Sequence, residues 1–306
     1  MSRSLGSIAW NLTLEAELVR VLTVLDPVEA VVFKGPLLTR QLYGDLGARI
    51  SSDNDLLIRS EDAGQALRAL ARDGYHPLPF DVAESTLAAQ GRVTLLKNAS
   101  SVVHTVDLHV AAFANSLFRV SAELVRAHLE PVALHGRTLL RFDKKLAFAH
   151  LVAHFVQHRF DDRILKDLGQ AWTRWQDVLR GESFREFAER TCTLEAFEYA
   201  ISAAHALGLT LGPKIAATCP RTRFVLRAFP PERIFEPIYL GYVRALWSTL
   251  LVRPTAMPKL AWRGVVLPAR ELAVRQQRPY EPWMRLERLR APFDELFARL
   301  REAQLP

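Results

Sequence analysis

The chain contains very little cysteine, and this scarcity argues against two kinds of architecture. Only Cys192 and Cys219 occur among its 306 residues, and they form no CxxC pair. A disulfide framework needs more cysteines, and a structural zinc site usually contains a closely spaced pair, so both are improbable here. We therefore expect a protein of a reducing compartment, and the cytoplasm is the natural setting.

Long apolar runs are also missing. The longest stretch without a charged residue, 199–213, contains a histidine, two glycines and a proline, and it is shorter than a bilayer-spanning helix. The N-terminal segment carries Glu15 and Glu17 and lacks the apolar core of a signal peptide. The sequence thus predicts no membrane partner.

Charge is not concentrated in any one segment. Lysine and arginine total 40 against 33 acidic residues, which gives a net charge of +7 without a block of five like charges. The excess favours a polyanionic ligand such as a nucleotide or nucleic acid, and a solvated basic surface is equally compatible with it. The length exceeds that of a usual single domain, so we expect two domains.

Two closely spaced acids, Asp53 and Asp55, precede the apolar segment Leu56-Leu57-Ile58. If this stretch is a strand, both carboxylates point to one face, because side chains alternate. Two carboxylates on one face repel unless a cation lies between them. Mg²⁺ binds one or two carboxylates together with substrate phosphates. The pattern therefore indicates a magnesium site, and an edge strand with its acids in water is the alternative.

A turn upstream of these acids has features of a phosphate-binding site. The apolar run Val28–Phe33 predicts a buried strand, and Leu37–Tyr43 predicts a helix. Between them, Gly35 permits a tight turn, and Pro36 suits the first position of the helix. A helix N-terminus attracts phosphate, and the ammonium of Lys34 can reach an anion bound there.

A third candidate acid lies in a predicted hairpin. We expect strands over Arg92–Lys97 and Ser101–Val110, joined by a turn at 98–100. Asp107 and His109 share one face of the second strand. Burial of a carboxylate there is costly without a partner, and a metal shared with the first two acids would supply one. A structural acid with another partner is the alternative.

Helical periodicity becomes dominant after Phe142, and the fold class predicted is α+β. We expect an α/β domain over residues 1–142 and an α-helical domain over 143–306. The first contains helices over 12–25 and 61–73, a short strand at 75–78 and a hairpin over 132–142 that turns at His135-Gly136. The second contains helices over Lys144–His158, Asp162–Arg180, Phe184–Glu189, Leu194–Leu207, Ile234–Leu251, Ala269–Gln276 and Met284–Ala303.

Several short motifs together carry a family resemblance. They are Lys34-Gly35, Arg49, Ser52-Asp53-x-Asp55-Leu56-Leu57-Ile58, Val106-Asp107-Leu108-His109, His150, His154 and Leu165-Lys166-Asp167-Leu168. On these motifs the chain, from about Val31 to Trp175, resembles a bacterial family of uncharacterised nucleotidyltransferases in the polymerase-beta-like superfamily.

The resemblance implies a small mixed sheet flanked by helices and a two-metal site. Asp53 and Asp55 match the paired metal ligands of the family, and Asp107 matches the third. The expected cofactor is Mg²⁺, and the expected partners are an NTP, with ATP as the first candidate, and an acceptor hydroxyl on a small molecule, a peptide or RNA. The implied reaction transfers NMP and releases pyrophosphate, with Asp107 also a candidate general base.

Two further groups of candidate residues accompany the acids. The candidates for nucleotide binding are Lys34, Gly35, Arg49 and Ser52. Arginine offers a bidentate fork to phosphate and lysine a point charge, while a plain surface cation is the alternative for each. The candidates for substrate contact are His109, His154 and Asp167. For His109, a hydrogen-bonded structural histidine is the alternative.

The chain departs from the superfamily pattern at three points. Pro36 stands where a phosphate-binding Ser or Gly is usual, so Ser51 or Ser52 is the candidate replacement. The separation between Gly35 and Asp53 is longer than in compact members, and Asn54 replaces an apolar residue, which indicates a less buried strand or an altered site. These departures support one alternative function, a catalytically weakened partner or regulatory protein. The basic charge supports another, an RNA-binding protein.

Overall fold

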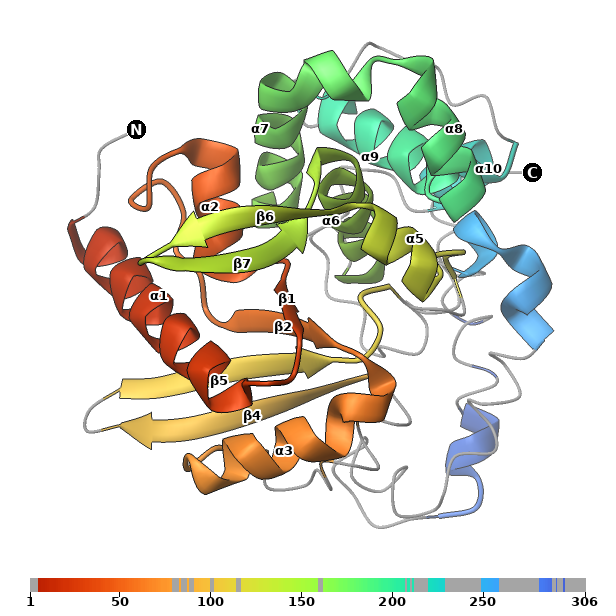
Figure 1. Cartoon of the computed structure of the whole chain (residues 1–306). Coiled ribbons are helices and arrows are strands. Elements are labelled where there is room, and N and C mark those ends of the chain that lie inside the picture. The colour runs from red at the N-terminus through yellow and green to blue at the C-terminus, as the bar shows by residue number, and fades with distance from the viewer. Residues whose placement is uncertain are drawn as a thin grey trace. The chain divides into compact units, whose positions relative to one another are not determined.

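The computed structural model describes residues 5–78, 83, 87, 91–99, 102–113, 117–158, 162–206, 208–209, 211, 220–228, 249–258, 281–287, 290 and 294. The chain forms two compact units. The first comprises Met1–Ala114 and Ser121–Ala147, and the second comprises Asn115–Val120 and Phe148–Pro306. The predicted α+β class is confirmed (Figure 1). The predicted domain boundary at residue 142 stays a prediction.

The first unit is built on a seven-stranded mixed sheet. Its strands are β1 (Ala30–Val32), β2 (Asn54–Ile58), β3 (His76–Pro77), β4 (Arg92–Ala99), β5 (Val102–His109), β6 (Leu129–Leu134) and β7 (Arg137–Phe142). They lie in the order β3-β4-β5-β2-β1-β7-β6. The pairs β2–β5 and β1–β7 are parallel, and the other neighbours are antiparallel. Strands far apart in the sequence therefore meet at the centre.

One face of this sheet packs against helices. The helical elements of the unit are α1 (Leu5–Leu25), α2 (Gly35–Tyr43), η1 (Ser60–Asp62), α3 (Ala63–Arg72) and α5 (Ala122–Ala127). Leu18 of α1 and Leu70 of α3 join Leu56, Val106 and Leu108 of the central strands in one buried core. Because strand side chains alternate, the odd-numbered residues of β2 and β5 point to the opposite face.

The two hairpins test the predicted turns. His135 (φ 46°) and Gly136 (φ 78°) form the turn between β6 and β7, as expected. The turn predicted at 98–100 is wrong, because β4 continues to Ala99, which pairs with Val102. Asn98 favours turns, but here its backbone pairs with Val103, so cross-strand pairing overrides the local preference.

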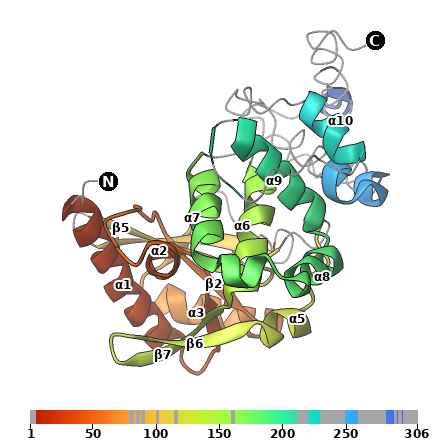
Figure 2. The ribbon, with the colours of Figure 1, turned by 90° about the horizontal axis from the view of Figure 1, so that it is seen from above.

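The second unit is helical in its described part. Its elements are α6 (Lys144–His158), which begins in the first unit, α7 (Asp162–Leu179), α8 (Glu182–Thr191), α9 (Leu194–Ala206), α10 (Pro220–Ala228) and η3 (Pro254–Ala256). Helices α6 and α7 lie side by side in both views (Figures 1 and 2). Phe148 of α6 contacts the rings of Trp172, Phe184 and Phe197, so aromatic packing joins four helices. This explains why the predicted helices up to residue 206 form.

Predicted helices further along the chain fall largely outside the described residues. Ile234–Leu251 is described only at 249–251, which are helical, and Ala269–Gln276 is not described. Met284–Ala303 is helical at 284–287, 290 and 294. Among the described residues no helix combines the length and apolar character needed to span a bilayer.

Candidate active site

Three buried side chains converge on the sheet face that points away from α1 and α3. The parallel register of β2 and β5 places Asp55 beside Asp107 and Leu57 beside His109. One ligand atom each from Asp55, Asp107 and His109 lies within 4.8 Å of the other two, and all three residues are buried. The long-range pairing of two strands thus builds a compact group with two carboxylates and one imidazole.

Asp53, the residue before β2, experiences the charges of this group. Its pKa is raised to about 6, first because burial disfavours the carboxylate and then because Asp55 and Asp107 repel it. The positive charge of Lys34 and a hydrogen bond from Ser52 offset only part of this rise. The carboxylates of Asp55 and Asp107 therefore lie near enough to repel that of Asp53, and this repulsion favours an added cation.

Lys34 supplies one cation to this site. Its Nζ lies 2.6 Å from Oδ1 of Asp55, and the two side chains are 12% and 2% exposed. His109 Nε2 lies 3.3 Å from the same oxygen. Burial alone would raise the pKa of Asp55, but Lys34 and His109 together hold it well below its usual range. Asp55 is therefore a charged carboxylate with a cation at contact distance.

Asp107 is held by strand β4. Thr94 donates a hydrogen bond from Oγ1 to Asp107 Oδ1 at 2.6 Å, and Arg92 Nη1 lies 3.9 Å from Oδ2. Neither Thr94 nor Arg92 is among the candidates that the sequence pattern indicates. The hairpin pairing of Ala99 with Val102 sets Thr94 opposite Asp107. A turn centred on residue 99 would instead set Gly91 there, so the register error concealed this contact.

The turn at Gly35 is shaped by close backbone packing. Gly35 has φ +69°, and a Cβ at this position would lie 2.8 Å from the backbone oxygen of Asp53. Helix α2 starts at Gly35, earlier than the predicted Leu37, and Pro36 lies in its first turn as predicted. Only glycine meets both requirements at this position, the left-handed φ and the absence of a side chain. The turn is therefore fixed directly against the segment that carries the acids.

Arg49 and the two serines before Asp53 differ in availability. Arg49 Nη1 donates to Ser51 Oγ at 3.2 Å, and Ser51 Oγ also lies 3.2 Å from Thr39 Oγ1. Ser51 is buried, and its backbone N–H donates to Asn11 Oδ1. Ser52 is exposed. Of the two serines considered as a replacement hydroxyl, Ser52 is thus the accessible one.

Comparison with known proteins agrees with this geometry. Residues 2–208 match the model of a family described as uncharacterised nucleotidyltransferase. The chain belongs to this nucleotidyltransferase family. Searches of curated proteins and of solved structures gave no match.

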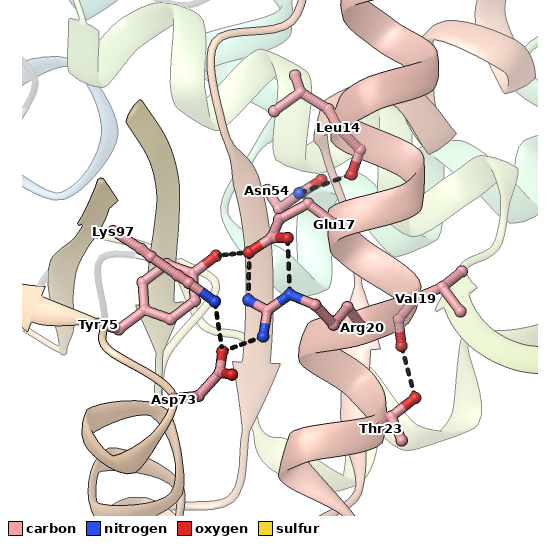
Figure 3. A network of polar contacts seen from close by, with 9 residues as sticks. All are labelled: Leu14, Glu17, Val19, Arg20, Thr23, Asn54, Asp73, Tyr75 and Lys97. Carbon is pink, nitrogen blue, oxygen red and sulfur yellow. Dashed lines mark hydrogen bonds and ion pairs between the residues drawn. The ribbon is translucent and has the colours of Figure 1, made fainter. Parts of the chain in front are cut away.

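In this nucleotidyltransferase, Asn54 lies on the opposite side of β2 from the acids. It is fully buried, and its Nδ2 donates to the backbone oxygen of Leu14 in α1 at 3.0 Å (Figure 3). All five residues of β2 are buried, so the interpretation of Asn54 as a sign of a less buried strand is wrong. The polar side chain is accommodated because α1 offers a carbonyl. Among the residues that the structure describes, none forms a hydrogen bond with Asn54 Oδ1.

The remaining candidates of the nucleotidyltransferase belong to its second compact unit. His154 lies on α6, with its ring stacked on that of His150 at 5.8 Å between centroids. Asp167 lies on α7 and is 1% exposed. Their predicted contact with substrate stays a prediction.

The donor set fits a divalent cation, which nucleotidyltransferases typically use. Asp53, Asp55 and Asp107 offer carboxylate oxygens, the preferred ligands of Mg²⁺. Burial raises the pKa of Asp53 first, and repulsion from Asp55 and Asp107 raises it further, while Lys34 offsets only part of the rise. A bound divalent ion would relieve this repulsion.

Proposed function

We propose that this chain is a metal-dependent nucleotidyltransferase that moves NMP from an NTP to a hydroxyl-bearing acceptor and releases pyrophosphate. The observation that carries the proposal is the alignment of Asp55 with Asp107 on adjacent parallel strands, in a chain that belongs to a nucleotidyltransferase family. ATP is the first nucleotide to test, and a small molecule, a peptide and RNA are the acceptor classes.

In this proposal the three aspartates hold the metal. Mg²⁺ bound by Asp53, Asp55 and Asp107 would stabilise negative charge on the triphosphate and on the departing pyrophosphate. The acceptor oxygen forms a bond to the α-phosphorus, the bond from that phosphorus to the β-phosphate oxygen breaks, and the hydroxyl proton passes to a carboxylate. Asp107 is the proposed base, and the hydrogen bond from Thr94 to its Oδ1 orients it.

The turn and the nearby cations would bind the phosphates. The missing side chain at Gly35 allows a polyphosphate to approach the backbone closely. Lys34 is already directed at the acids, and a bound nucleotide would give its ammonium a second anion. Arg49 and Ser52 are the proposed remaining phosphate contacts. Arg49 already donates to Ser51, whereas the side chain of Ser52 is exposed.

The test uses NTPs labelled at the α-phosphate, together with Mg²⁺. It measures transfer of the label to candidate acceptor molecules from each of the three acceptor classes. Asp55→Asn and Asp107→Asn should each lower the rate by roughly 10³-fold, since each removes charge stabilisation of several kcal/mol. The matched control is Glu29→Gln, an exposed acid of the same unit, which should keep the rate.

Calorimetry with a non-hydrolysable ATP analogue and Mg²⁺ separates binding from transfer. The intact chain should bind the analogue, and Asp55→Asn should weaken this binding. Absence of nucleotide binding with all three aspartates intact would contradict the proposal. Tight binding without transfer to any acceptor class would instead favour the regulatory alternative.

A further inference from the structure

His109 directs a nitrogen atom into the group of acids. It is the last residue of β5, and its side chain is 8% exposed. Its Nε2 lies 3.3 Å from Asp55 Oδ1, and its ligand atom lies within 4.8 Å of those of Asp55 and Asp107. The imidazole therefore faces the carboxylates that the proposed function assigns to the metal.

Aromatic packing holds the imidazole in this orientation. The ring of Phe33 meets the ring of His109 edge to face, with centroids 5.0 Å apart and planes at 82°. Phe33 in turn stacks on Phe142 at 5.1 Å. Phe33 directly follows β1, and Phe142 is the last residue of β7. Apolar side chains at the ends of these two strands thus support the imidazole ring of His109. A histidine with its orientation fixed by packing is preorganised to offer a ligand atom.

The site already accommodates a cation. The ammonium of Lys34 lies 2.6 Å from Asp55 Oδ1, the oxygen that His109 also faces. Positive charge is therefore favourable at the point where the imidazole nitrogen and the carboxylate oxygens meet. The ion pair of Lys34 with Asp55 is a separate observation from the close spacing of the ligand atoms of Asp55, Asp107 and His109.

A mixed nitrogen and oxygen donor set distinguishes between divalent ions. Mg²⁺ is a hard ion that takes oxygen ligands in a strict octahedron, whereas imidazole suits first-row transition ions. We propose that His109 is a metal ligand together with Asp55 and Asp107, and that the site consequently selects Mn²⁺ or a related transition ion over Mg²⁺. The inference rests on the proposed function for the presence of a metal site, and it adds the nitrogen ligand and the class of ion.

The deciding experiment uses Mn²⁺ as a paramagnetic probe of the full chain without nucleotide. Pulsed electron paramagnetic resonance should detect coupling of the bound Mn²⁺ to an imidazole nitrogen in the wild type. Competition between Mn²⁺ and Mg²⁺ should show a preference for Mn²⁺ of roughly tenfold or more. His109→Gln should abolish the nitrogen coupling and reduce the preference to about threefold or less.

His76→Gln is the matched control, because His76 is an exposed histidine on β3 of the same unit. It should keep both the coupling and the preference. The wild-type spectrum decides the ligand question even if His109→Gln fails to fold. Absence of nitrogen coupling in the Mn²⁺-loaded wild type, absence of Mn²⁺ binding, or an unchanged ion preference in His109→Gln would each overturn the inference.

The two proposals fail in different ways. Mg²⁺-driven nucleotidyl transfer without nitrogen coupling to bound Mn²⁺ would overturn the role of His109 and leave the proposed function intact. Nitrogen coupling that depends on His109, without nucleotide binding or transfer, would overturn the proposed function and leave the metal ligand intact.

Discussion

Lys34 and Asp55 form a buried ion pair in the acidic site, with 2.6 Å between Nζ and Oδ1. The lysine follows the strand β1 directly after Phe33, and the aspartate lies within the neighbouring strand β2. A metal that binds Asp55 competes with the ammonium for the same oxygen. A nucleotide would offer Lys34 phosphate oxygens in exchange, so metal binding and nucleotide binding should reinforce each other.

Substitution of Lys34 tests this competition. In Lys34→Gln, Asp55 loses its closest cation, so the metal-free protein should lose about 3–5 kcal/mol of its free energy of unfolding. Mg²⁺ should bind more tightly than in the wild type, because no ammonium opposes it, and should restore part of the lost stability. Urea denaturation with and without Mg²⁺ measures both effects. The control is Arg72→Gln, which removes an exposed cation of the same unit and should keep the wild-type stability. An unchanged free energy of unfolding of metal-free Lys34→Gln would contradict the prediction.

Gly35 can be tested against a second glycine with a similar backbone. Gly35→Ala places a Cβ at φ +69° and 2.8 Å from the backbone oxygen of Asp53, whereas Gly136→Ala meets nothing within 4 Å at φ +78°. The left-handed conformation alone costs roughly 1–2 kcal/mol, so Gly136→Ala should lose about that much stability. Gly35→Ala should lose more and should also weaken binding of the ATP analogue, because the turn must move away from Asp53.

Thermal denaturation and calorimetry compare the two glycine variants. Equal losses of stability in Gly35→Ala and Gly136→Ala would show that the close approach to Asp53 has no consequence. Undiminished nucleotide binding in Gly35→Ala would contradict the role of the turn in binding phosphate.

The two serines before Asp53 should separate binding from stability. Ser52→Ala removes an exposed hydroxyl and should weaken binding of the ATP analogue by roughly tenfold, the value of one hydrogen bond to a charged group. Ser51→Ala leaves Arg49 and Thr39 without a shared partner and should lower stability by about 1–3 kcal/mol. Calorimetry and urea denaturation of both variants check this division. A larger loss of nucleotide affinity in Ser51→Ala than in Ser52→Ala would reverse the assignment.

Local sequence patterns were sufficient for elements whose signals act over a few residues. The limits of α6, Lys144–His158, agree with the expected helix, and the hairpin turn at His135-Gly136 lies where a glycine permits a positive φ. The alternation around Asp53 and Asp55 likewise located β2. In each case the pattern of apolar residues and turn residues reports directly on the local backbone.

The partners within the candidate site depend on pairings that no local pattern encodes. Asp55 meets Asp107 only because β2 and β5 pair in parallel at one register, across about fifty residues of sequence that also contain β3 and β4. Thr94 meets Asp107 through a hairpin in which the expected turn would have moved the partner of Asp107 by three residues, to Gly91. A shift of register by one residue reverses the face on which a side chain lies. The contact of Lys34 with Asp55 depends on another pairing, that of β1 with β2, which brings the end of β1 beside Asp55.

A second polar network is separate from the aspartates of the candidate active site. It lies where α1 meets the end of α3 and strand β4 (Figure 3). Glu17 accepts hydrogen bonds from Arg20 Nε at 2.8 Å and from the hydroxyl of Tyr75 at 2.5 Å. Arg20 also pairs with Asp73, which Lys97 contacts at 3.2 Å. Glu17 is 8% exposed, so its charge depends on these partners.

This network predicts an acid-sensitive contribution to stability. Burial acts to raise the pKa of Glu17, but hydrogen bonds from Arg20 and Tyr75 outweigh it and lower the pKa from 4.5 to about 2. The unfolded chain therefore takes up the proton first on acidification. The contribution is complete above about pH 4.5, is lost as the pH falls towards about 2, and amounts to about 3 kcal/mol at neutral pH.

Glu17→Gln should therefore be less stable than the wild type by about 3 kcal/mol at neutral pH, with the gap narrowing as the pH falls below about 4.5. Urea denaturation at neutral pH and at about pH 3 measures this gap. Glu29→Gln removes an exposed acid of the same unit and should track the wild type at both values. A gap that stays constant on acidification would show that the lost stability comes from altered packing of Gln and not from the charge of Glu17, because only the charge responds to protonation in this range.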